Sequence, residues 1–593
     1  MKTWLREVSF TDIKKELPEM LKTINDTVRI SILRNIVIEP IEEYLKFFCA
    51  SIGLRAECRF SQFNAVYQSI HNSEEVINSD TEIIVILLKL ENISRNLALR
   101  ACTLHKKQIR QEQKNILLFL NSVFGAIRKK TSAIILFHLF EMPSYPAYGI
   151  LDYQGKHQLR AIQDLNNALL LMKEEFNNLY FIDNNSLLER IGAETMYDYR
   201  LWHIAQAPYT NAALREMAWE ECKFIRAAKG KVKKCLALDC DNTLWGGIIG
   251  EDGIKNIQLG TEYPGSCFYE LQEEILNLYH RGVLLALNSK NNERDVWEIF
   301  EKHPHMLLKK RHFACWKINW QSKHENLQQI ARDLDIGLDS IVFLDDSSFE
   351  LNLVKKYLPQ VEIIHLPEQF SDYRNTLQKC GLFDSYVLSQ EDKKRTKMYQ
   401  VESLRKQHKE NFQNIDDYLR SLKIELTISR ADEFSIPRLA QLTQRTNQFN
   451  LTTHRYSENQ IEKMSKDKRN TILYVKYKDR FGESGIVGMA IVELLGKEAC
   501  LDSFLLSCRV IGRKVENALL YYCAQIAKYK KCGKLFGIYC KTEKNSIVED
   551  FYPQMKFDLV KSNTKETIFG LDLRKSILPI PPKIFNKVLF SGR

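Results

Sequence analysis

Two aspartates, Asp239 and Asp241, stand one residue apart directly after the apolar run at 235–238, and Thr243 follows them. A short apolar run of this kind predicts a buried strand, so both carboxylates would emerge at its carboxyl end, where open α/β sheets bind ligands. Close carboxylates repel one another and favour a bound cation such as Mg²⁺. A nucleophilic aspartate beside a hard metal ion is suited to cleaving phosphate esters, so this segment predicts phosphate chemistry.

Three later segments place further polar groups at predicted strand ends and helix starts. Ser289 ends an apolar run, and its hydroxyl suits a phosphoryl oxygen. Lys323 opens a predicted helix, where its charge would neutralise a phosphorylated aspartate, although Lys290 is an alternative for that role. Asp345 and Asp346 end another predicted strand and would complete a metal site. Because these groups recur in order at strand ends and a helix start, they predict one shared site rather than isolated surface charges.

Length and charge limit the classes of function. A chain of 593 residues predicts about three to five domains. Lys and Arg outnumber Asp and Glu by 85 to 74, for a formal net charge of +11. The basic residues are scattered, which indicates solvated faces; attraction to phosphorylated metabolites or an acidic carrier protein is the alternative. No long basic run interleaved with aromatic residues occurs, so we expect no nucleic-acid partner.

Cysteine usage and apolar segments predict a cytoplasmic protein. The 14 cysteines show no zinc-ligand spacing, and many lie in apolar runs, as reduced thiols do. Residues 1–9 carry charges and no apolar core of a secretory signal. The best apolar stretch, 83–90, is too short to cross a bilayer. We therefore expect no membrane association.

Four segments differ in pattern and predict an α/β multidomain protein. Strands and helices alternate over 1–230 and again over 231–384, which predicts two parallel α/β domains. Residues 385–420 are charged and predict a helical connector. Residues 421–593 combine several successive strands with one amphipathic helix, which predicts an α+β domain.

The strands expected in these domains can be given by residue number. In the first domain they are 29–33, 82–88, 132–137 and 179–182. In the second they are 235–238, 283–287, 313–314, 341–344 and 361–364. In the third they are 424–429, 471–477, 486–494, 500–506 and 535–538, with a helix at 515–529. We expect the last stretch, 576–593, to be irregular.

The Asp-x-Asp-x-Thr segment, followed in order by the three later groups, resembles the haloacid-dehalogenase (HAD) superfamily of phosphotransferases. The resemblance implies that Asp239 attacks phosphorus and that Asp241 protonates the leaving oxygen and then activates water. It implies a Mg²⁺ site made by the Asp239 carboxylate, the Asp241 backbone carbonyl and Asp346, with Asp345 as a second candidate. Phosphoryl oxygens would be held by Thr243, Ser289 and Lys323. An inactive, degenerate site is the alternative.

A narrower resemblance, to the FkbH-like glyceryl transferases of polyketide biosynthesis, covers nearly the whole chain. The segments that carry it are 197–202, 208–209, 239–247 (DCDNTLWGG), 250–253 (GEDG), 289–291, 343–346, 448–453 (QFNLTT) and 507–513 (SCRVIGR). The resemblance implies that 1,3-bisphosphoglycerate is the substrate and that its phosphate is removed. The glyceryl unit would then form a thioester on the phosphopantetheine arm of an acyl carrier protein.

The third domain resembles the GNAT acyltransferase fold, in which a loop before a helix binds the pyrophosphate of coenzyme A. The resemblance implies that Arg509, Gly512 and Arg513 bind the carrier's pantetheine phosphate. Lys514 stands where that fold has a small residue, which disfavours tight coenzyme A binding.

Cys508, next to this loop, is the candidate thiol for accepting the acyl group, because neighbouring arginines and a helix amino terminus favour a thiolate. That Cys508 only packs is an equal alternative. His454 is a candidate base for it, although a solvated histidine is the commoner case. Cys240 is less attractive, because strand alternation points its side chain away from the two aspartates.

The first domain resembles the SGNH-hydrolase-like region of the same family. The predicted strand at 29–33 leads into Arg34 without a Gly-Asp-Ser turn, and Asp198 and His203 lack the Asp-x-x-His spacing. We therefore predict a non-catalytic domain that serves as a platform for the carrier protein. Two readings of the whole chain compete with glyceryl transfer: a phosphatase fused to an acetyl-CoA-dependent acetyltransferase, and a non-catalytic scaffold that binds a carrier protein.

Overall fold

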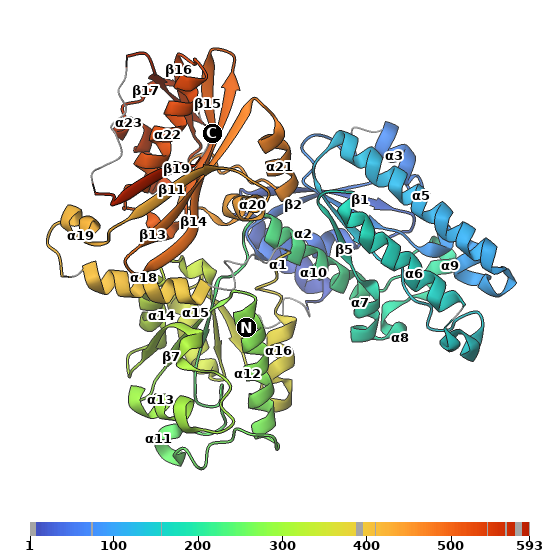
Figure 1. Cartoon of the computed structure of the whole chain (residues 1–593). Coiled ribbons are helices and arrows are strands. Elements are labelled where there is room, and N and C mark those ends of the chain that lie inside the picture. The colour runs from blue at the N-terminus through green and yellow to red at the C-terminus, as the bar shows by residue number, and fades with distance from the viewer. Residues whose placement is uncertain are drawn as a thin grey trace. The chain divides into compact units, whose positions relative to one another are not determined.

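The computed structural model describes residues 8–72, 75–155, 157–386, 395–409, 411–542, 544–563, 566–575 and 584–591. The chain divides into two compact units, Met1–Lys231 and Val232–Arg593. Unit 1 holds one parallel α/β sheet, and unit 2 holds a second parallel sheet and a larger mixed one (Figure 1). The predicted α/β multidomain fold is confirmed.

Unit 1 is built on a five-stranded sheet of order β2-β1-β3-β4-β5, in which all neighbours are parallel; we call it the β1 sheet. Its strands are β1 (Thr27–Arg34), β2 (Arg55–Phe60), β3 (Ile83–Leu87), β4 (Ile134–His138) and β5 (Leu179–Ile182). All five residues of β3 are buried, as expected for a central strand covered on both faces. Of these strands, the sequence analysis did not predict β2.

Helices cover both faces of the β1 sheet. One face packs against α1 (Phe10–Leu21), α2 (Ile41–Ser51) and α10 (Asn211–Ala228). The other packs against α3 (Val66–Asn72), α5 (Lys106–Lys130) and α6 (Gln158–Leu171). Shorter helices are α4 (Arg95–Leu99), α7 (Asn184–Ile191), α8 (Ala193–Met196) and α9 (Tyr199–Ala205).

The first sheet of unit 2, which we call the β6 sheet, is also five-stranded and parallel, with the order β10-β9-β6-β7-β8. Its strands are β6 (Cys235–Leu238), β7 (Leu284–Ser289), β8 (Phe313–Ile318), β9 (Ile341–Asp345) and β10 (Glu362–His365). The chain builds outward from β6 through β7 and β8, then returns to the other side of β6 with β9. The carboxyl ends of β6 and β9 therefore form the point where strand order reverses, the usual place for a ligand in such sheets.

Two helix layers enclose the β6 sheet. Apolar side chains of α12 (Gly265–His280), α13 (Glu293–Lys302) and α16 (Tyr373–Lys379) pack on one face, and those of α14 (Lys323–Asp333) and α15 (Ser348–Tyr357) pack on the other. The short helix α11 (Ile249–Asp252) follows the glycine pair after β6. Each helix thus buries one stripe, as expected for a doubly wound sheet.

The C-terminal sheet has the strand order β17-β18-β16-β15-β14-β13-β11-β19. Its strands are β11 (Glu425–Arg430), β12 (Phe449–Asn450), β13 (Asn470–Asp479), β14 (Gly482–Leu495), β15 (Glu498–Leu506), β16 (Lys534–Tyr539), β17 (Asp558–Ser562), β18 (Thr567–Asp572) and β19 (Lys587–Ser591). Its helices are α18 (Arg395–Lys409), α19 (Ile415–Ser421), α20 (Ile436–Arg445), α21 (Glu458–Lys466), α22 (Val515–Tyr529) and α23 (Phe551–Gln554). The predicted helix at 515–529 is present.

A short inserted strand marks the middle of the C-terminal sheet. The parallel pairing of β15 with β16 ends at Leu501 and Gly537. Beyond that point β12 pairs with the last residues of β15, and the Leu451 carbonyl accepts a 2.7 Å hydrogen bond from the amide of Cys540, just after β16. The predicted motif at 448–453 therefore fills the space between two strands of the sheet.

Two parts of the sequence behave differently from expectation. Residues 587–591 of the expected irregular tail form β19, which pairs in parallel with β11; residues 576–583 lie outside the described part. Within the expected connector, α18 packs into the C-terminal domain through a buried ion pair described below.

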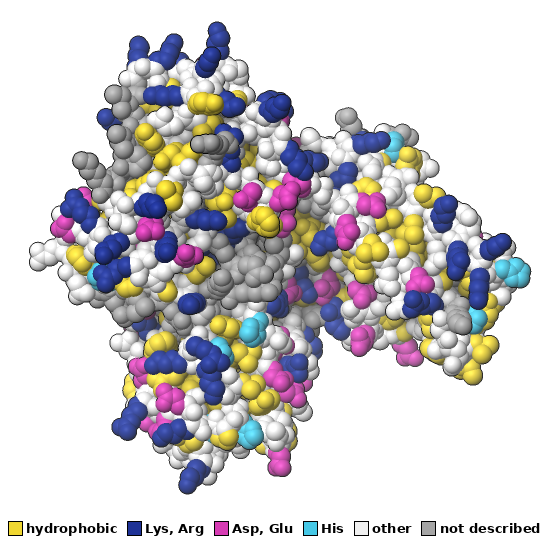
Figure 2. All heavy atoms as spheres, in the orientation of Figure 1, with side chains coloured by type: hydrophobic (Ala, Val, Ile, Leu, Met, Phe, Trp, Pro, Cys, Tyr) yellow, Lys and Arg dark blue, Asp and Glu magenta, His cyan; other side chains and the backbone are white. Residues whose placement is uncertain are grey.

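Among the described residues, no helix has both the length and the apolar character needed to cross a bilayer. On the face in Figure 2, basic and acidic side chains are interspersed.

Candidate active site

Three aspartates meet at the carboxyl ends of β6 and β9. Asp239 directly follows β6, Asp345 is the last residue of β9, and Asp346 comes next. One carboxylate oxygen of each lies within 4.8 Å of the others. We call these residues the carboxylate cluster. Because β6 and β9 are parallel neighbours, the arrangement expected from the sequence follows directly from the sheet topology.

Lys323 is the basic residue that faces the carboxylate cluster. It opens α14, and its Nζ lies 2.9 Å from Asp239 Oδ2 and 2.6 Å from Asp345 Oδ2. Burial alone would lower the pKa of Lys323, but the charges of Asp239 and Asp345 raise it, so the ammonium stays protonated. Lys290, the alternative, instead forms a 2.6 Å ion pair with Glu350.

The carboxylate cluster carries more negative charge than Lys323 can balance. Burial, followed by repulsion from Asp239, raises the pKa of Asp345 to about 7. The same two causes raise the pKa of Asp346. Three convergent carboxylates against one ammonium fit a hard divalent cation, and oxygen ligands of this kind are what Mg²⁺ prefers.

The carboxylate of Asp241 lies outside the carboxylate cluster and has its own partners. Oδ1 accepts hydrogen bonds from the Trp245 indole at 2.9 Å and the Ile249 amide at 3.2 Å. Oδ2 accepts one from the Asn291 amide group at 3.0 Å. Burial raises the pKa of Asp241 in spite of these donors. A carboxyl group held in place with a raised pKa is suited to proton transfer.

The two predicted hydroxyls both lie at this edge of the sheet and are buried. Thr243 Oγ1 donates to Asp346 Oδ1 at 3.4 Å. Ser289, the last residue of β7, accepts a 3.0 Å hydrogen bond from Asn291. Thus the strand ends of β6, β7 and β9, with the start of α14, supply every residue that the sequence placed in the phosphate site.

Sequence reasoning gave no role to three residues that support this site. Asn291 links Asp241 to Ser289, His365 Nε2 lies 2.9 Å from the Asp346 carbonyl oxygen, and Trp245 holds Asp241. The only sequence signal was that Trp245 and Asn291 lie within the quoted motif segments. His365 stands at the end of a different strand, β10, and gave no local signal.

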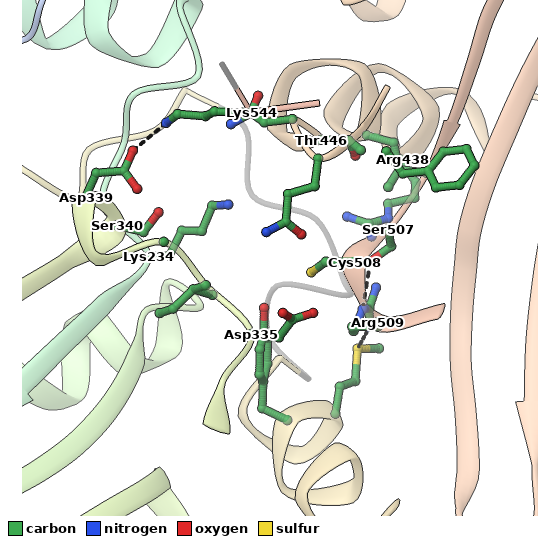
Figure 3. Close-up of a pocket in the computed structure, with 18 residues that line it drawn as sticks. Lys234, Asp335, Asp339, Ser340, Arg438, Thr446, Ser507, Cys508, Arg509 and Lys544 are labelled. Atoms are coloured by element: carbon green, nitrogen blue, oxygen red, sulfur yellow. Dashed lines mark hydrogen bonds and ion pairs between the residues drawn. The ribbon is translucent and has the colours of Figure 1, made fainter. Parts of the chain in front are cut away.

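Cys508 lines a cavity of about 270 Å³ in unit 2 (Figure 3). It begins a single 3₁₀ turn after β15 and is half-buried. Burial raises the pKa of its thiol, although the charges of Lys234 and Arg509 act in the opposite direction. The thiol is therefore protonated at rest, contrary to the expectation that its basic neighbours favour a thiolate. We call this cavity the Cys508 pocket.

The predicted pantetheine-phosphate residues differ in their surroundings. Arg509 lines the Cys508 pocket and donates to Ser507 Oγ at 3.2 Å. Arg513, in contrast, is buried; it pairs with Glu402 of α18 and donates to the Tyr477 hydroxyl at 3.2 Å. Gly512 has a φ of 77° in the turn before α22. The geometry therefore gives Arg513 a structural role and no access to a phosphate.

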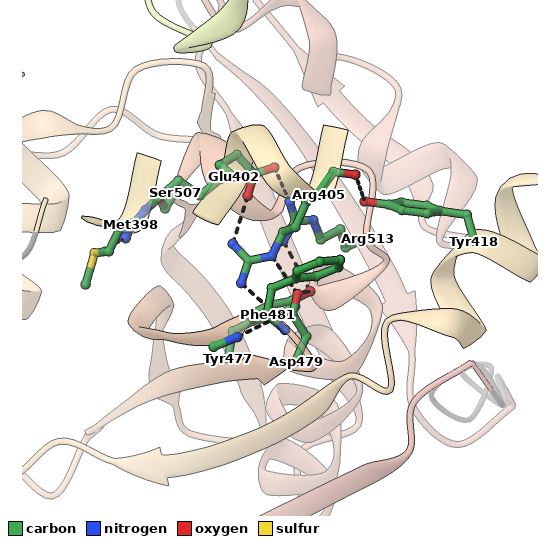
Figure 4. Close-up of polar contacts among 11 residues, drawn as sticks. Met398, Glu402, Arg405, Tyr418, Tyr477, Asp479, Phe481, Ser507 and Arg513 are labelled. Atoms are coloured by element: carbon green, nitrogen blue, oxygen red, sulfur yellow. Dashed lines mark hydrogen bonds and ion pairs between the residues drawn. The ribbon is translucent and has the colours of Figure 1, made fainter. Parts of the chain in front are cut away.

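A buried charge network fixes α18 beside this turn (Figure 4). Arg405 donates to both oxygens of Asp479, at 2.7 and 2.8 Å, and its Nη1 contacts Glu402 at 3.0 Å. The side chains of Arg405 and Asp479 are 1% and 0% exposed. Charges this deeply buried remain only because each is paired. The helix expected as a connector is thus tied to the C-terminal domain by this network, while its Tyr399 packs against apolar residues of the β6 sheet.

Two further residues that the sequence analysis singled out, Lys514 and His454, also contact acidic side chains. Lys514 forms a 2.7 Å ion pair with Asp416. His454 Nδ1 lies 3.3 Å from Asp502 Oδ1, and the Asp502 hydrogen bond raises the pKa of His454. His454 does not line the Cys508 pocket, so the geometry offers no support for it as the base that serves Cys508.

The carboxyl end of the β1 sheet holds a different group of polar residues, which we call the Glu141 cluster: Lys89, Glu141, Tyr197 and Tyr209. Lys89 forms an ion pair with Glu141, and both tyrosine hydroxyls donate to Glu141. The Lys89 ammonium also lies 4.6 Å from the centre of the Tyr197 ring. The Glu141 carboxylate therefore has an ion-pair partner and two hydroxyl donors from its own chain.

Comparison with solved structures gives an extended likeness. It is to the N-terminal part of the protein BF1531 from Bacteroides fragilis, which contains a phosphatase domain and is complexed with Mg. Sequence identity is 26%, the TM-score is 0.57, and the likeness covers 64% of this chain and 100% of that one. It supports a phosphatase domain in this chain.

Several acetyltransferases also match part of the chain, and two of them each match a quarter of it. The ribosomal-protein-S18-alanine N-acetyltransferase from Escherichia coli has 15% identity and a TM-score of 0.21 over 94% of its length. The PaiA N-acetyltransferase from Thermoplasma acidophilum, in complex with coenzyme A, has 16% identity and a TM-score of 0.19 over 98% of its length. No protein-family model matches this sequence, and no curated protein matches it either.

Proposed function

We propose that this protein is a Mg²⁺-dependent phosphatase coupled to acyl transfer. It would take 1,3-bisphosphoglycerate, remove the phosphate ester, and load the glyceryl unit as a thioester on the phosphopantetheine arm of an acyl carrier protein in polyketide biosynthesis. The observation that carries the phosphatase part is the carboxylate cluster with Lys323 in contact. The Mg found with BF1531 supports the same metal here.

In the phosphatase step, Asp239 attacks the phosphorus atom in line, and the bond to the ester oxygen breaks. Asp241 gives its proton to the leaving oxygen and then takes one from the water that hydrolyses the aspartyl-phosphate. Lys323, Thr243 and Ser289 hold the oxygens of the transferring group. A bound Mg²⁺, held by Asp239, Asp346 and the Asp241 carbonyl, would offset phosphate charge. Asp345, already paired with Lys323, is the second candidate ligand.

In the acyl-transfer step, the sulfur of Cys508 attacks the carbonyl carbon of the acyl phosphate. The bond between that carbon and the phosphate oxygen breaks, and the thiol proton leaves with the phosphate. A second thiol exchange passes the acyl group to the carrier arm, and that arm's proton returns to Cys508. Burial raises the pKa of Cys508, so the thiol must give up its proton to a phosphate oxygen of the substrate as it attacks, because the thiolate is the nucleophile.

An acetyl-CoA-dependent acetyltransferase remains the competing proposal for the C-terminal domain. The interior position of Arg513 and the ion pair of Lys514 with Asp416 weigh against it, because both side chains adjoin the turn where coenzyme A would bind. The third reading, a scaffold without catalysis, is disfavoured by the full set of groups in the carboxylate cluster.

One assay separates these proposals. Enzyme, Mg²⁺, 1,3-bisphosphoglycerate and phosphopantetheinylated carrier protein are incubated, and the carrier is weighed by intact mass spectrometry. We expect a glyceryl adduct without phosphate. Acetyl transfer from acetyl-CoA to an amine, with no adduct, would support the acetyltransferase. Carrier binding without either reaction would leave only the scaffold.

A further inference from the structure

The Cys508 pocket is built from two parts of unit 2 that are far apart in sequence (Figure 3). The β6 sheet contributes Lys234, just before β6, and the loop at 335–340 between α14 and β9. The C-terminal domain contributes the turn after β15, parts of α18 and α20, and Lys544. An ion pair between Lys544 and Asp339 joins the two walls. The pocket thus depends on both domains being in place.

The charge of the lining favours an anionic ligand. Four lining residues are basic and two are acidic: Lys234, Arg438, Arg509 and Lys544 against Asp335 and Asp339. The remaining polar groups are hydroxyls and amides, which bind oxygen-rich ligands without adding charge. A concave wall with an excess of cations attracts phosphate or carboxylate groups. At about 270 Å³, it is smaller than the roughly 300–1,000 Å³ typical for drug-sized ligands, so a small metabolite is the appropriate class.

The Cys508 pocket and the carboxylate cluster lie at opposite ends of the β6 sheet. Lys234 precedes β6 and Asp239 follows it; five residues of extended chain separate them, about 16 Å at about 3.3 Å per residue. The loop at 335–340 likewise precedes β9, whereas Asp345 and Asp346 end it. A small molecule bound beside Cys508 cannot place its phosphoryl group against Asp239.

We propose that the Cys508 pocket is a second anion-binding site, which holds a small anionic acyl compound beside the thiol while the carboxylate cluster works separately at the other end of the sheet. This inference rests on the acyl-transfer part of the proposed function. Acylation of Cys508 and removal of a phosphate ester then occur at two separate sites. The acyl unit must therefore move between the Cys508 pocket and the carboxylate cluster. The step at Cys508 forms the carbon–sulfur bond, breaks the carbon–oxygen bond to the leaving phosphate, and sends the thiol proton out with it.

Protection of Cys508 from alkylation tests the site. The protein is treated with iodoacetamide, and labelling of the Cys508 peptide is followed by mass spectrometry. Inorganic phosphate and 3-phosphoglycerate are each added as probes, against sodium chloride at equal ionic strength. We expect both probes to slow labelling severalfold, and Lys234→Met to remove that protection. Lys302→Met is the matched control, because Lys302 pairs with Glu298 on the solvent-facing side of α13 and should leave protection intact.

Asp239→Asn decides whether the two sites are separate. We expect full protection of Cys508 in this variant, because the probe acts at the other end of the sheet. Loss of protection there, or equal labelling with phosphate and chloride in the wild-type protein, would overturn the inference. If Lys234→Met unfolds, Lys544→Gln replaces it. Hydrolysis of p-nitrophenyl phosphate is measured in parallel, so that failure of the pocket is distinguished from failure of the proposed phosphatase.

Discussion

The β1 sheet and the β6 sheet share five parallel strands and helices on both faces, yet their carboxyl ends carry opposite electrostatic arrangements. At the β6 sheet, three carboxylates converge on one lysine. At the β1 sheet, Glu141 contacts Lys89 and two tyrosine hydroxyls, and Glu91 lies 3.9 Å from the same lysine. The first arrangement leaves negative charge that a cation would balance; the second is complete by itself.

This difference shows that sheet topology provides a place where a ligand can bind. The balance of acidic and basic side chains at that place then decides whether a cation can bind there. Both edges lie where α/β sheets bind ligands. Only the carboxylate cluster offers hard oxygen ligands in excess of the local positive charge. In the Glu141 cluster, the charges of Glu141 and Glu91 raise the pKa of Lys89 against the effect of burial, which keeps this ammonium protonated.

The largest effect is expected from Asp239→Asn, which removes the proposed nucleophile while keeping the shape of the side chain. Phosphatase turnover should fall by about 10³-fold or more, because no aspartyl-phosphate can form. The measurement is steady-state release of phosphate. Asp183→Asn is the matched control: Asp183 also follows a strand, β5 of the β1 sheet, and caps α7 through the Asn185 amide, a bond that asparagine can keep. Equal losses in both variants would contradict the assignment.

Asp241→Asn should cost about 10²–10⁴-fold where the leaving group needs a proton. An alkyl phosphate such as glycerol phosphate needs one, whereas p-nitrophenolate leaves without it. We therefore expect a much larger loss on the alkyl ester than on p-nitrophenyl phosphate. The ratio of kcat/KM for the two substrates reports this directly, and an identical loss on both would exclude Asp241 as the acid.

Glu141→Gln should destabilise unit 1 by about 3–5 kcal/mol, because the buried Lys89 ammonium loses its closer counter-ion and keeps only Glu91, at 3.9 Å. Phosphatase activity at temperatures below the transition should stay at the wild-type level. Chemical denaturation followed by circular dichroism, with the activity assay beside it, checks both points. A loss of activity in the still-folded variant would show that the β1 sheet takes part in the reaction.

Magnesium should raise the free energy of unfolding of unit 2 by about 2.7 kcal/mol when the Mg²⁺ concentration is a hundredfold above Kd. The free energy of unfolding of unit 1 should not change. Differential scanning calorimetry with Mg²⁺ and with EDTA would resolve the two effects, since each unit has its own core. Asp239→Asn should reduce the shift because it removes one carboxylate ligand. A shift of the unit 1 transition instead would place the metal outside the carboxylate cluster.

The strands and their terminal residues could be predicted because buried parallel strands are short, nearly continuous apolar runs. The carboxylate cluster followed, since the ends of parallel neighbours meet at one edge. Strands with little burial were missed: every residue of β17 is exposed, and only one residue of β2 is fully buried. Without an apolar pattern, only hydrogen bonding to a neighbour defines such strands.

Contacts between distant segments could not be predicted at all. Arg405 and Asp479 are 74 residues apart in sequence, and neither position signals its partner. The burial of Arg513 was likewise not predicted, because its partner Glu402 belongs to a helix whose charged sequence indicates a solvated connector. The protonated state of Cys508 was missed because burial outweighs charge at that position, and burial is a property of the packed fold.

The final strand has a practical consequence. β19 covers the outer edge of β11 through residues 587–591, and the Phe590 ring stacks on Tyr522 of α22 at 4.8 Å. Removing these residues would expose unpaired amide and carbonyl groups along β11. Such an edge favours strand pairing between molecules. Any tag or fusion partner that follows β19 therefore needs a spacer, so that recombinant protein does not self-associate through an uncovered edge of β11.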